Sequence, residues 1–231
     1  MKIKGFQGTS LLDFPGRLAA LVFTGGCNLA CPYCHNPGLV LEPDQYPDYP
    51  LADLFDDLRS RAGFIDGIVI SGGEPTLDPG LSDFLARLKE MELEVKLDTN
   101  GLRPDVLRPL LEKNQVDYLA IDLKTALDRY SELDSHPVDV APLVDTIALT
   151  RTFDVATEFR TTCVPGLVEV DDIHAMGTAI KGADLWVLQQ FVPDHSLDEN
   201  LHEVSPHSAE VLQGFVRSAE GYVENLTLRG V

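Results

Sequence analysis

Long apolar runs are absent from this chain. None of its 231 residues lies in a stretch that approaches the roughly 18 consecutive apolar residues of a membrane-spanning helix. The first residues, Met1 to Gln7, also lack the apolar run of a secretory signal peptide. We therefore expect a cytoplasmic protein with no membrane partner.

Basic residues are scarce as well. The chain has 18 Lys and Arg against 37 Asp and Glu, and its formal net charge is -19. Most of this surface would repel nucleic acid, so we expect no nucleic-acid partner. The negative charge fits two interpretations, a solvated and soluble surface or a partner with a basic docking face, and the first is favoured because charge reports mainly on solubility.

Linkers, low-complexity tracts and a second zone of composition are also missing. The length is sufficient to bury a large core. The sequence therefore predicts a single domain over residues 1–231.

Short β-branched and apolar segments alternate with amphipathic ones, which predicts βαβ units and a parallel sheet. The predicted strands cover residues 18–24, 67–71, 93–97, 116–122, 157–163 and 185–191. The predicted helices cover residues 51–61, 81–91, 104–112, 140–152, 171–180 and 208–219. Six strands do not complete an eight-stranded barrel, which leaves an open (β/α)6 barrel or a doubly wound sheet. In either fold the active site lies at the carboxyl ends of the strands.

Cysteine is rare, but three of the four cysteines fall within eight residues, in the pattern Cys27-x3-Cys31-x2-Cys34. Such clustering in a cytosolic protein favours metal or redox chemistry over disulfides. A glutaredoxin-type dithiol would leave Cys27 unexplained, and haem attachment at Cys31–His35 normally follows export. A Cys3His zinc site would need the adjacent Cys34 and His35 to bind one ion.

Three thiolates without a near fourth suit a 4Fe-4S cube that keeps one iron open to another ligand. The C-x3-C-x2-C pattern resembles the signature of the radical S-adenosylmethionine (SAM) superfamily. The resemblance implies that Cys27, Cys31 and Cys34 bind the cluster and that Tyr33 lies against the adenine of SAM. The fourth cysteine, Cys163, has no role in that pattern and is expected in the core.

The segment Gly72-Gly73-Glu74 follows an apolar strand. Two glycines at this point form a tight turn in many α/β proteins. The resemblance adds that the segment binds the amino group of SAM through backbone carbonyl and carboxylate groups. Glu74 would then either accept from that ammonium or brace the turn.

Three polar residues end the next two strands: Asp98, in Asp-Thr-Asn-Gly, and Asp122 with Lys124. From the residues alone these are an Asx-type turn and a surface ion pair. Similar motifs in glycyl-radical activating enzymes imply that Lys124 lies near the carboxylate of SAM. They also imply that the aspartates surround a monovalent cation.

Arg160 lies in a segment that resembles the fifth-strand motif of the same enzymes. The resemblance implies that Arg160 contacts the cofactor from the barrel interior. The alternative is a buried arginine paired with Glu158 or Asp154.

Two further segments, residues 5–16 and Cys34-His35-Asn36-Pro37, resemble the activating protein of anaerobic ribonucleoside-triphosphate reductase. This implies an open (β/α)6 partial TIM-type barrel of the radical SAM type. It also implies abstraction of a hydrogen from one glycine of a partner glycyl radical enzyme, with a reducing electron donor such as flavodoxin or ferredoxin. The alternatives are an activator of the formate-lyase type, a small-molecule radical SAM enzyme and an iron-sulfur electron carrier.

Overall fold

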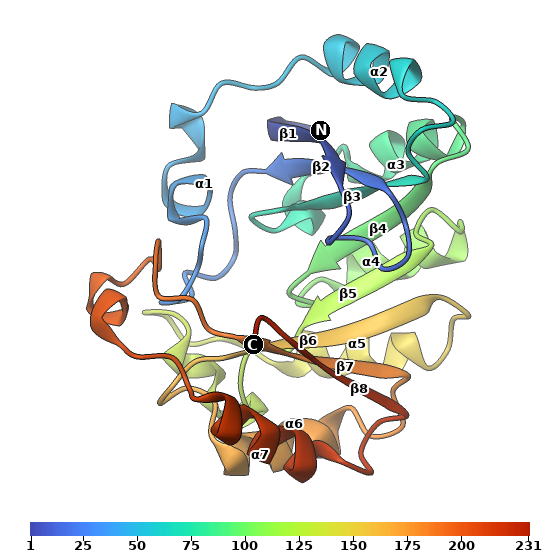
Figure 1. Cartoon of the computed structure of the whole chain (residues 1–231). Helices are drawn as coiled ribbons and strands as arrows, with labels where there is room; N and C mark the ends of the chain where they lie inside the picture. Colours follow the sequence, from blue (N-terminus) through green and yellow to red (C-terminus); the bar gives the residue numbers. More distant parts are fainter. The chain divides into compact units, whose positions relative to one another are not determined.

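A computed structural model describes all residues from Met1 to Val231. The protein is an α/β protein whose eight strands follow chain order in a mostly parallel sheet (Figure 1). The chain divides into two compact units, which we describe separately. The first comprises residues 1–28, 38–99 and 105–119, and the second comprises residues 29–37, 100–104 and 120–231.

The first unit contains strands β1 to β4 and the start of β5. β1 pairs antiparallel with β2, and β2–β3 and β3–β4 pair in parallel. The strands are β1 (Ile3–Ser10), β2 (Ala19–Thr24), β3 (Gly67–Gly72), β4 (Glu94–Thr99) and β5 (Tyr118–Asp122). The helices along this part of the chain are α1 (Pro37–Leu41), α2 (Leu51–Ser60), α3 (Leu81–Lys89) and α4 (Pro104–Glu112).

The core of the first unit follows from its side-chain patterns. β2 and β3 are nearly continuous apolar runs, as expected for strands that are covered on both faces. In α3 the residues Leu81, Leu85 and Leu88 recur at helical spacing and are buried.

The second unit contains the end of β5 and three parallel strands, β6 (Ala156–Cys163), β7 (Leu185–Gln190) and β8 (Asn225–Arg229). Its helices are α5 (Ala141–Thr150), α6 (Val170–Ala179) and α7 (Ala209–Ala219). Helices α6 and α7 lie side by side (Figure 1). Four short 3-10 helices complete the chain: η1 (Pro43–Gln45), η2 (Pro75–Leu77), η3 (Leu127–Glu132) and η4 (Glu199–Glu203).

All six predicted strands and all six predicted helices are present, with ends that differ by at most two residues. The prediction of only six strands is wrong, because β1 and β8 flank them. β1 contains two glycines and β8 has only five residues, and most residues of both strands are partly exposed. Neither segment therefore carries the apolar run by which the other strands were predicted.

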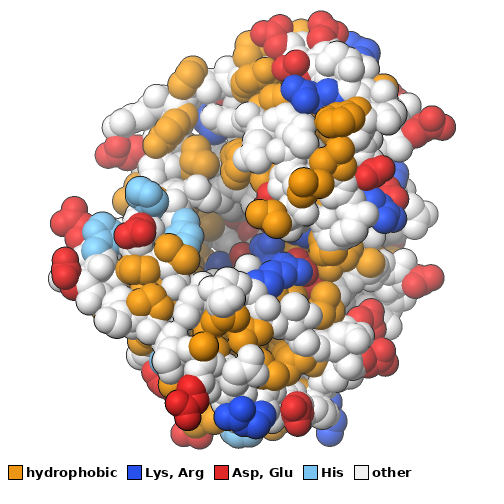
Figure 2. Space-filling view, in the orientation of Figure 1, with side chains coloured by type: hydrophobic (Ala, Val, Ile, Leu, Met, Phe, Trp, Pro, Cys, Tyr) orange, Lys and Arg blue, Asp and Glu red, His pale blue; other side chains and the backbone are white.

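The surface and the helices bear on two further expectations. Asp and Glu side chains are spread over the visible face and do not gather in one patch (Figure 2). On this face, the scattered carboxylates fit the interpretation of the charge as a solvated surface. None of the helices combines the length and the apolar character of a membrane span.

Candidate functional site

The glycine turn after β3 packs against the segment that leads into the cysteine loop. The amide of Gly73 donates to the carbonyl of Thr24 (2.9 Å), and the amide of Glu74 donates to the carbonyl of Gly26 (2.8 Å). Gly72 has a φ of +112°, and a Cβ atom on either glycine would clash with the backbone of residues 24–26. Glycine is therefore required here both for conformation and for close approach.

Glu74 braces this turn. Its side chain is buried, and its Oε1 accepts from the amide of Thr76 (3.1 Å), the hydroxyl of Thr76 (2.6 Å) and the hydroxyl of Thr99 (2.8 Å). The bond to Thr99 joins the turn after β3 to the end of β4. The bracing role that the sequence left open is therefore confirmed, whereas a contact with SAM stays a prediction.

Asp98, near the end of β4, lies beside a residue that the sequence analysis did not select. Lys96 is 1% exposed, and its ammonium is paired with the Asp98 carboxylate. The ring centroid of Tyr118 lies 5.8 Å from the same ammonium. The missed signal is a lysine between the apolar residues Val95 and Leu97, two residues before the predicted aspartate.

Cys31, Tyr33 and Cys34 belong to a turn in the second unit, in which the amide of Cys34 donates to the carbonyl of Cys31 (2.9 Å). Burial raises the pKa of the Cys31 thiol, and the nearby ammonium of Lys124 opposes this effect. Burial likewise raises the pKa of the Tyr33 hydroxyl well above its usual value, so Tyr33 is neutral.

Three hydrogen bonds hold the cysteine loop to other segments of the second unit. The amide of Ala30 donates to Asp134 Oδ2 (2.9 Å), and the amide of Asp198 donates to the carbonyl of Pro32 (2.8 Å). Nε2 of His35 lies 2.8 Å from the carbonyl of Val192. A carbonyl can only accept, so His35 carries its proton on Nε2. His35 is thus tied to a backbone carbonyl.

Lys124 links this loop to the end of β5. Its Nζ lies 6.0 Å from the ring centroid of Tyr33 and 3.5 Å from Oδ2 of Asp122, and its side chain is only 16% exposed. The ion pair with Asp122 is therefore present and partly buried, whereas a contact of Lys124 with SAM stays a prediction. The backbone amide of Lys124 donates to the hydroxyl of Tyr130 (3.1 Å), which fixes the turn that carries the lysine.

Arg160, on β6, is mostly buried and binds Asp122, a partner that the sequence did not indicate. Its Nε and Nη2 both lie 2.8 Å from Oδ1 of Asp122. The buried carboxylate of Glu158 accepts from Arg229 (2.8 Å). Asp122 therefore lies between two cations, Lys124 and Arg160.

The cysteines divide by environment. Cys163 is completely buried, and burial raises the pKa of its thiol to about 12, so the expectation of a core residue is confirmed.

No disulfide joins the cysteines, and no group of three or more His, Cys, Asp or Glu side chains surrounds a single ion position. Thiolates of a 4Fe-4S cube bind three different irons and need not converge on one point. The donor set of Cys27, Cys31 and Cys34 therefore fits such a cluster.

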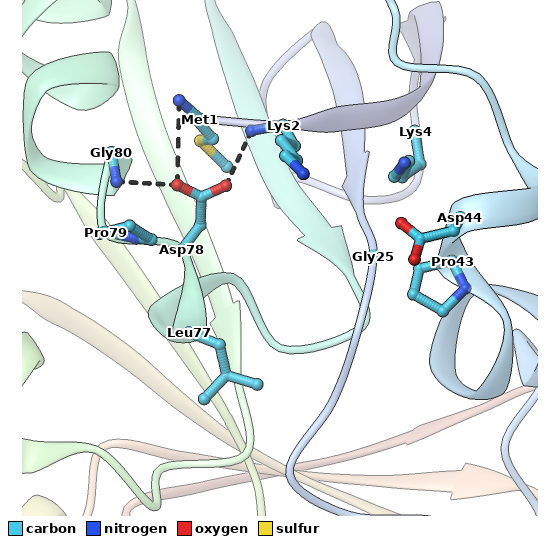
Figure 3. A pocket seen from close by; sticks show the side chains of 10 residues that line it. All are labelled: Met1, Lys2, Lys4, Gly25, Pro43, Asp44, Leu77, Asp78, Pro79 and Gly80. Carbon is cyan, nitrogen blue, oxygen red and sulfur yellow. Dashed lines mark hydrogen bonds and ion pairs between the residues drawn. The ribbon is translucent and has the colours of Figure 1, made fainter.

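A cavity of about 470 Å³ lies elsewhere in the first unit, at the start of β1 (Figure 3). Asp78 lines one wall of this cavity, and its carboxylate accepts hydrogen bonds from the amides of Lys2 (2.7 Å) and Gly80 (2.8 Å). Lys4 on the opposite wall is paired with Asp48 (2.7 Å). These charges are satisfied within the fold, so we do not include this cavity in the candidate site.

A comparison with protein-family models identifies the family to which the chain belongs. Residues 21–176 match the family model described as the radical SAM superfamily, and this range covers the cysteine loop, the glycine turn, Lys124 and Arg160. The chain belongs to the radical SAM superfamily. It is therefore an enzyme that uses a 4Fe-4S cluster and SAM.

This radical SAM enzyme also has close relatives. It is 34% identical to the "Putative glycyl-radical enzyme activating enzyme" of Methanocaldococcus jannaschii, over 99% of this chain and 96% of the relative. It is 29% identical to the pyruvate formate-lyase-activating enzyme of Streptococcus mutans, over 81% of this chain and 75% of the relative. The enzyme thus belongs with the glycyl-radical enzyme activating enzymes.

Solved structures bear on the fold alone. The enzyme resembles the radical SAM coproporphyrinogen III oxidase (HemN) of Escherichia coli with a TM-score of 0.58 and 14% identity. The match covers 89% of this chain but only 52% of HemN, so the enzyme spans about half of that structure. The predicted fold class, an α/β protein of the radical SAM type, is confirmed.

Proposed function

We propose that this radical SAM enzyme activates a glycyl radical enzyme by removing a hydrogen from the Cα of one glycine. When bound, the cluster supplies the electron that cleaves SAM to methionine and a deoxyadenosyl radical. Glycine is a fitting substrate because its radical is stabilised by the flanking amides. The absence of a side chain also lets its backbone enter a narrow site.

The residues around β5 support this proposal most directly. Lys124 lies near both Tyr33 and Asp122, so one unit brings together the residue proposed to contact adenine and the cation proposed to contact the carboxylate of SAM. Arg160 adds a second cation on the far side of Asp122. With Lys124, it would orient the carboxylate end of the cofactor by charge.

The remaining site residues have complementary roles in the proposal. Cys27, Cys31 and Cys34 would bind three irons and leave the fourth open to SAM. The backbone at Gly72 and Gly73 would approach the amino group of SAM, because no side chain stands in the way there. Glu74 would hold that backbone in place through its threonine bonds.

We propose anaerobic ribonucleoside-triphosphate reductase as the partner. Residues 5–16 and the segment from Cys34 to Pro37 support this choice, since both resemble the activator of that reductase. A glycyl radical enzyme of the formate-lyase type is the second candidate, and the likeness to the Streptococcus mutans enzyme favours it. A flavodoxin or ferredoxin is the proposed source of electrons.

The experiment is the anaerobic reaction of reduced enzyme and SAM with each candidate partner. The readout is the glycine-centred doublet in the electron paramagnetic resonance spectrum. We expect a doublet on the reductase, and none when its radical-bearing glycine is changed to alanine. A doublet only on the formate-lyase-type enzyme would move the assignment to the second candidate. Rapid release of deoxyadenosine without any doublet would instead indicate a small-molecule substrate.

A further inference from the structure

A completely buried lysine stands on β4 of the first unit. Lys96 pairs in register with Val69 of β3, and Val69 belongs to an apolar cluster with Phe14, Ala19 and Leu21. Register partners on parallel strands point to the same face of the sheet, so Lys96 shares the face of this cluster. Lysine is almost never completely buried unless it is paired with an opposite charge.

The partner of Lys96 is Asp98, two residues along the same strand and therefore on the same face. The aspartate side chain is 13% exposed and the lysine side chain 1% exposed, so solvent screens the contact little. The Tyr118 ring, 5.8 Å from the ammonium, adds a weaker attraction. The fold thus provides a fixed positive charge at Asp98.

Asp98 is one of the aspartates that the family resemblance places around a monovalent cation. A small cation bound directly to its carboxylate would lie close to the ammonium of Lys96, where two like charges repel strongly in a poorly hydrated place. The residues present therefore do not fit a separate monovalent cation at Asp98.

We propose that Lys96 replaces this cation, so that its ammonium supplies the positive charge beside Asp98 that bound sodium or potassium would otherwise supply. Binding of SAM is then independent of added sodium or potassium. Lys96 acts as a positioning residue, since its effect on SAM is exerted through Asp98. The inference rests on the proposed function only in placing Asp98 at the cofactor site.

The test measures the affinity of the anaerobically reconstituted holoenzyme for SAM at constant ionic strength. Choline, a bulky quaternary ammonium without an N–H donor, is the control cation and is compared with potassium, sodium and methylammonium. The natural enzyme should bind SAM equally well in all four. In choline, Lys96→Met should bind SAM at least about tenfold more weakly than the natural enzyme, because the Asp98 carboxylate has lost its charged partner. The small cations should restore most of the lost affinity.

Matched variants control for folding. Lys96→Met combined with Asp98→Asn removes both charges, so its affinity should not respond to any cation. Lys96→Gln, which retains a long side chain with a hydrogen-bond donor, serves if Lys96→Met does not fold. The inference is overturned if the natural enzyme itself requires potassium or sodium. It is also overturned if small cations raise neither the SAM affinity nor the melting temperature of a stable Lys96 variant.

A second readout separates this inference from the proposed function. The melting temperature of the cluster-free Lys96→Met protein should rise on addition of potassium or methylammonium but not of choline. If that rise occurs while the affinity for SAM is the same in every variant and salt, Lys96 does replace a cation. The placement of Asp98 at the cofactor site would then be wrong.

Discussion

Cys27, Cys31 and Cys34 share one short loop, whereas Cys163 lies in the core at the end of β6. Changing any one of the three loop cysteines to alanine should abolish the cluster, because each supplies one iron with its only protein ligand. Cys163→Ala should retain about four irons per chain by chemical analysis after anaerobic reconstitution. Loss of all iron from a folded Cys163→Ala protein would contradict the assignment of the three loop cysteines.

Lys124 offers a test of the electrostatic part of the site. Lys124→Ala should retain the cluster but bind SAM about ten- to a hundredfold more weakly, because a charge-assisted contact contributes about 1.5–3 kcal/mol. Isothermal titration of the anaerobic holoenzyme measures the change. Lys181→Ala, at an exposed lysine of the same unit, is the matched control and should bind SAM normally. Equal affinity in both variants would remove Lys124 from the cofactor site.

At the scale of single residues, the sequence indicated which residues belong to the candidate site but not which residues they contact. The spacing of the cysteines and the glycine turn could be predicted because both are local patterns. The bond from Glu74 to Thr99 and that from Arg160 to Asp122 join distant positions. Nothing in the neighbourhood of Arg160 favoured Asp122 over Glu158. Contacts of this kind depend on which strands become neighbours, and a single sequence does not encode that locally.

At the scale of elements, apolar strands and amphipathic helices were predictable, because burial imposes a strict period on their side chains. β1 and β8 were not, since partly exposed strands with glycines or few residues carry little of that pattern. The conformation of the cysteine loop was equally hidden. It depends on Asp134, Val192 and Asp198, which lie about a hundred residues or more along the chain.

The tie from Asp134 to the cysteine loop leads to a prediction about the cluster. Asp134→Ala removes the acceptor of the Ala30 amide, next to Cys31, and should let this part of the loop move. The variant should bind a complete cluster yet lose its absorbance in air severalfold faster than the natural enzyme, since a charged-group hydrogen bond contributes about 1.5–3 kcal/mol.

Asp134→Asn is the matched control for that experiment. Its amide oxygen can still accept from Ala30, so its cluster should decay at nearly the natural rate. Equal decay in all three proteins would mean that the loop is held without Asp134. If Asp134→Ala binds no iron at all, the hydrogen bond between Asp134 and Ala30 is instead needed for assembly of the cluster.

At the scale of the whole molecule, the single domain over residues 1–231 stays a prediction, and the path of the chain suggests how to test it. The chain passes between the two compact units five times, after residues 28, 37, 99, 104 and 119. Independent domains are usually joined by few crossings, in exposed linkers. Here one crossing lies inside the cysteine loop and another inside β5. We therefore expect neither unit to fold without the other.

Cooperative unfolding tests this expectation. Trp186 is the only tryptophan, is completely buried and belongs to the second unit, so its fluorescence reports on that unit alone. Far-ultraviolet circular dichroism reports on both units. In urea titrations of the cluster-free protein the two signals should change together, as in a two-state transition. Leu85→Ala, at a buried position of α3 in the first unit, should destabilise the protein by about 2–5 kcal/mol.

If the chain is one cooperative domain, Leu85→Ala must lower the midpoint of the Trp186 transition as much as that of the dichroism, although Trp186 lies in the other unit. Ser60→Ala, near the exposed end of α2 in the first unit, should leave both midpoints nearly unchanged. Two separate domains would be shown if Leu85→Ala left the midpoint of the Trp186 transition unchanged and the dichroism curve split into two steps. The active-site residues would then be distributed over two independently folding parts.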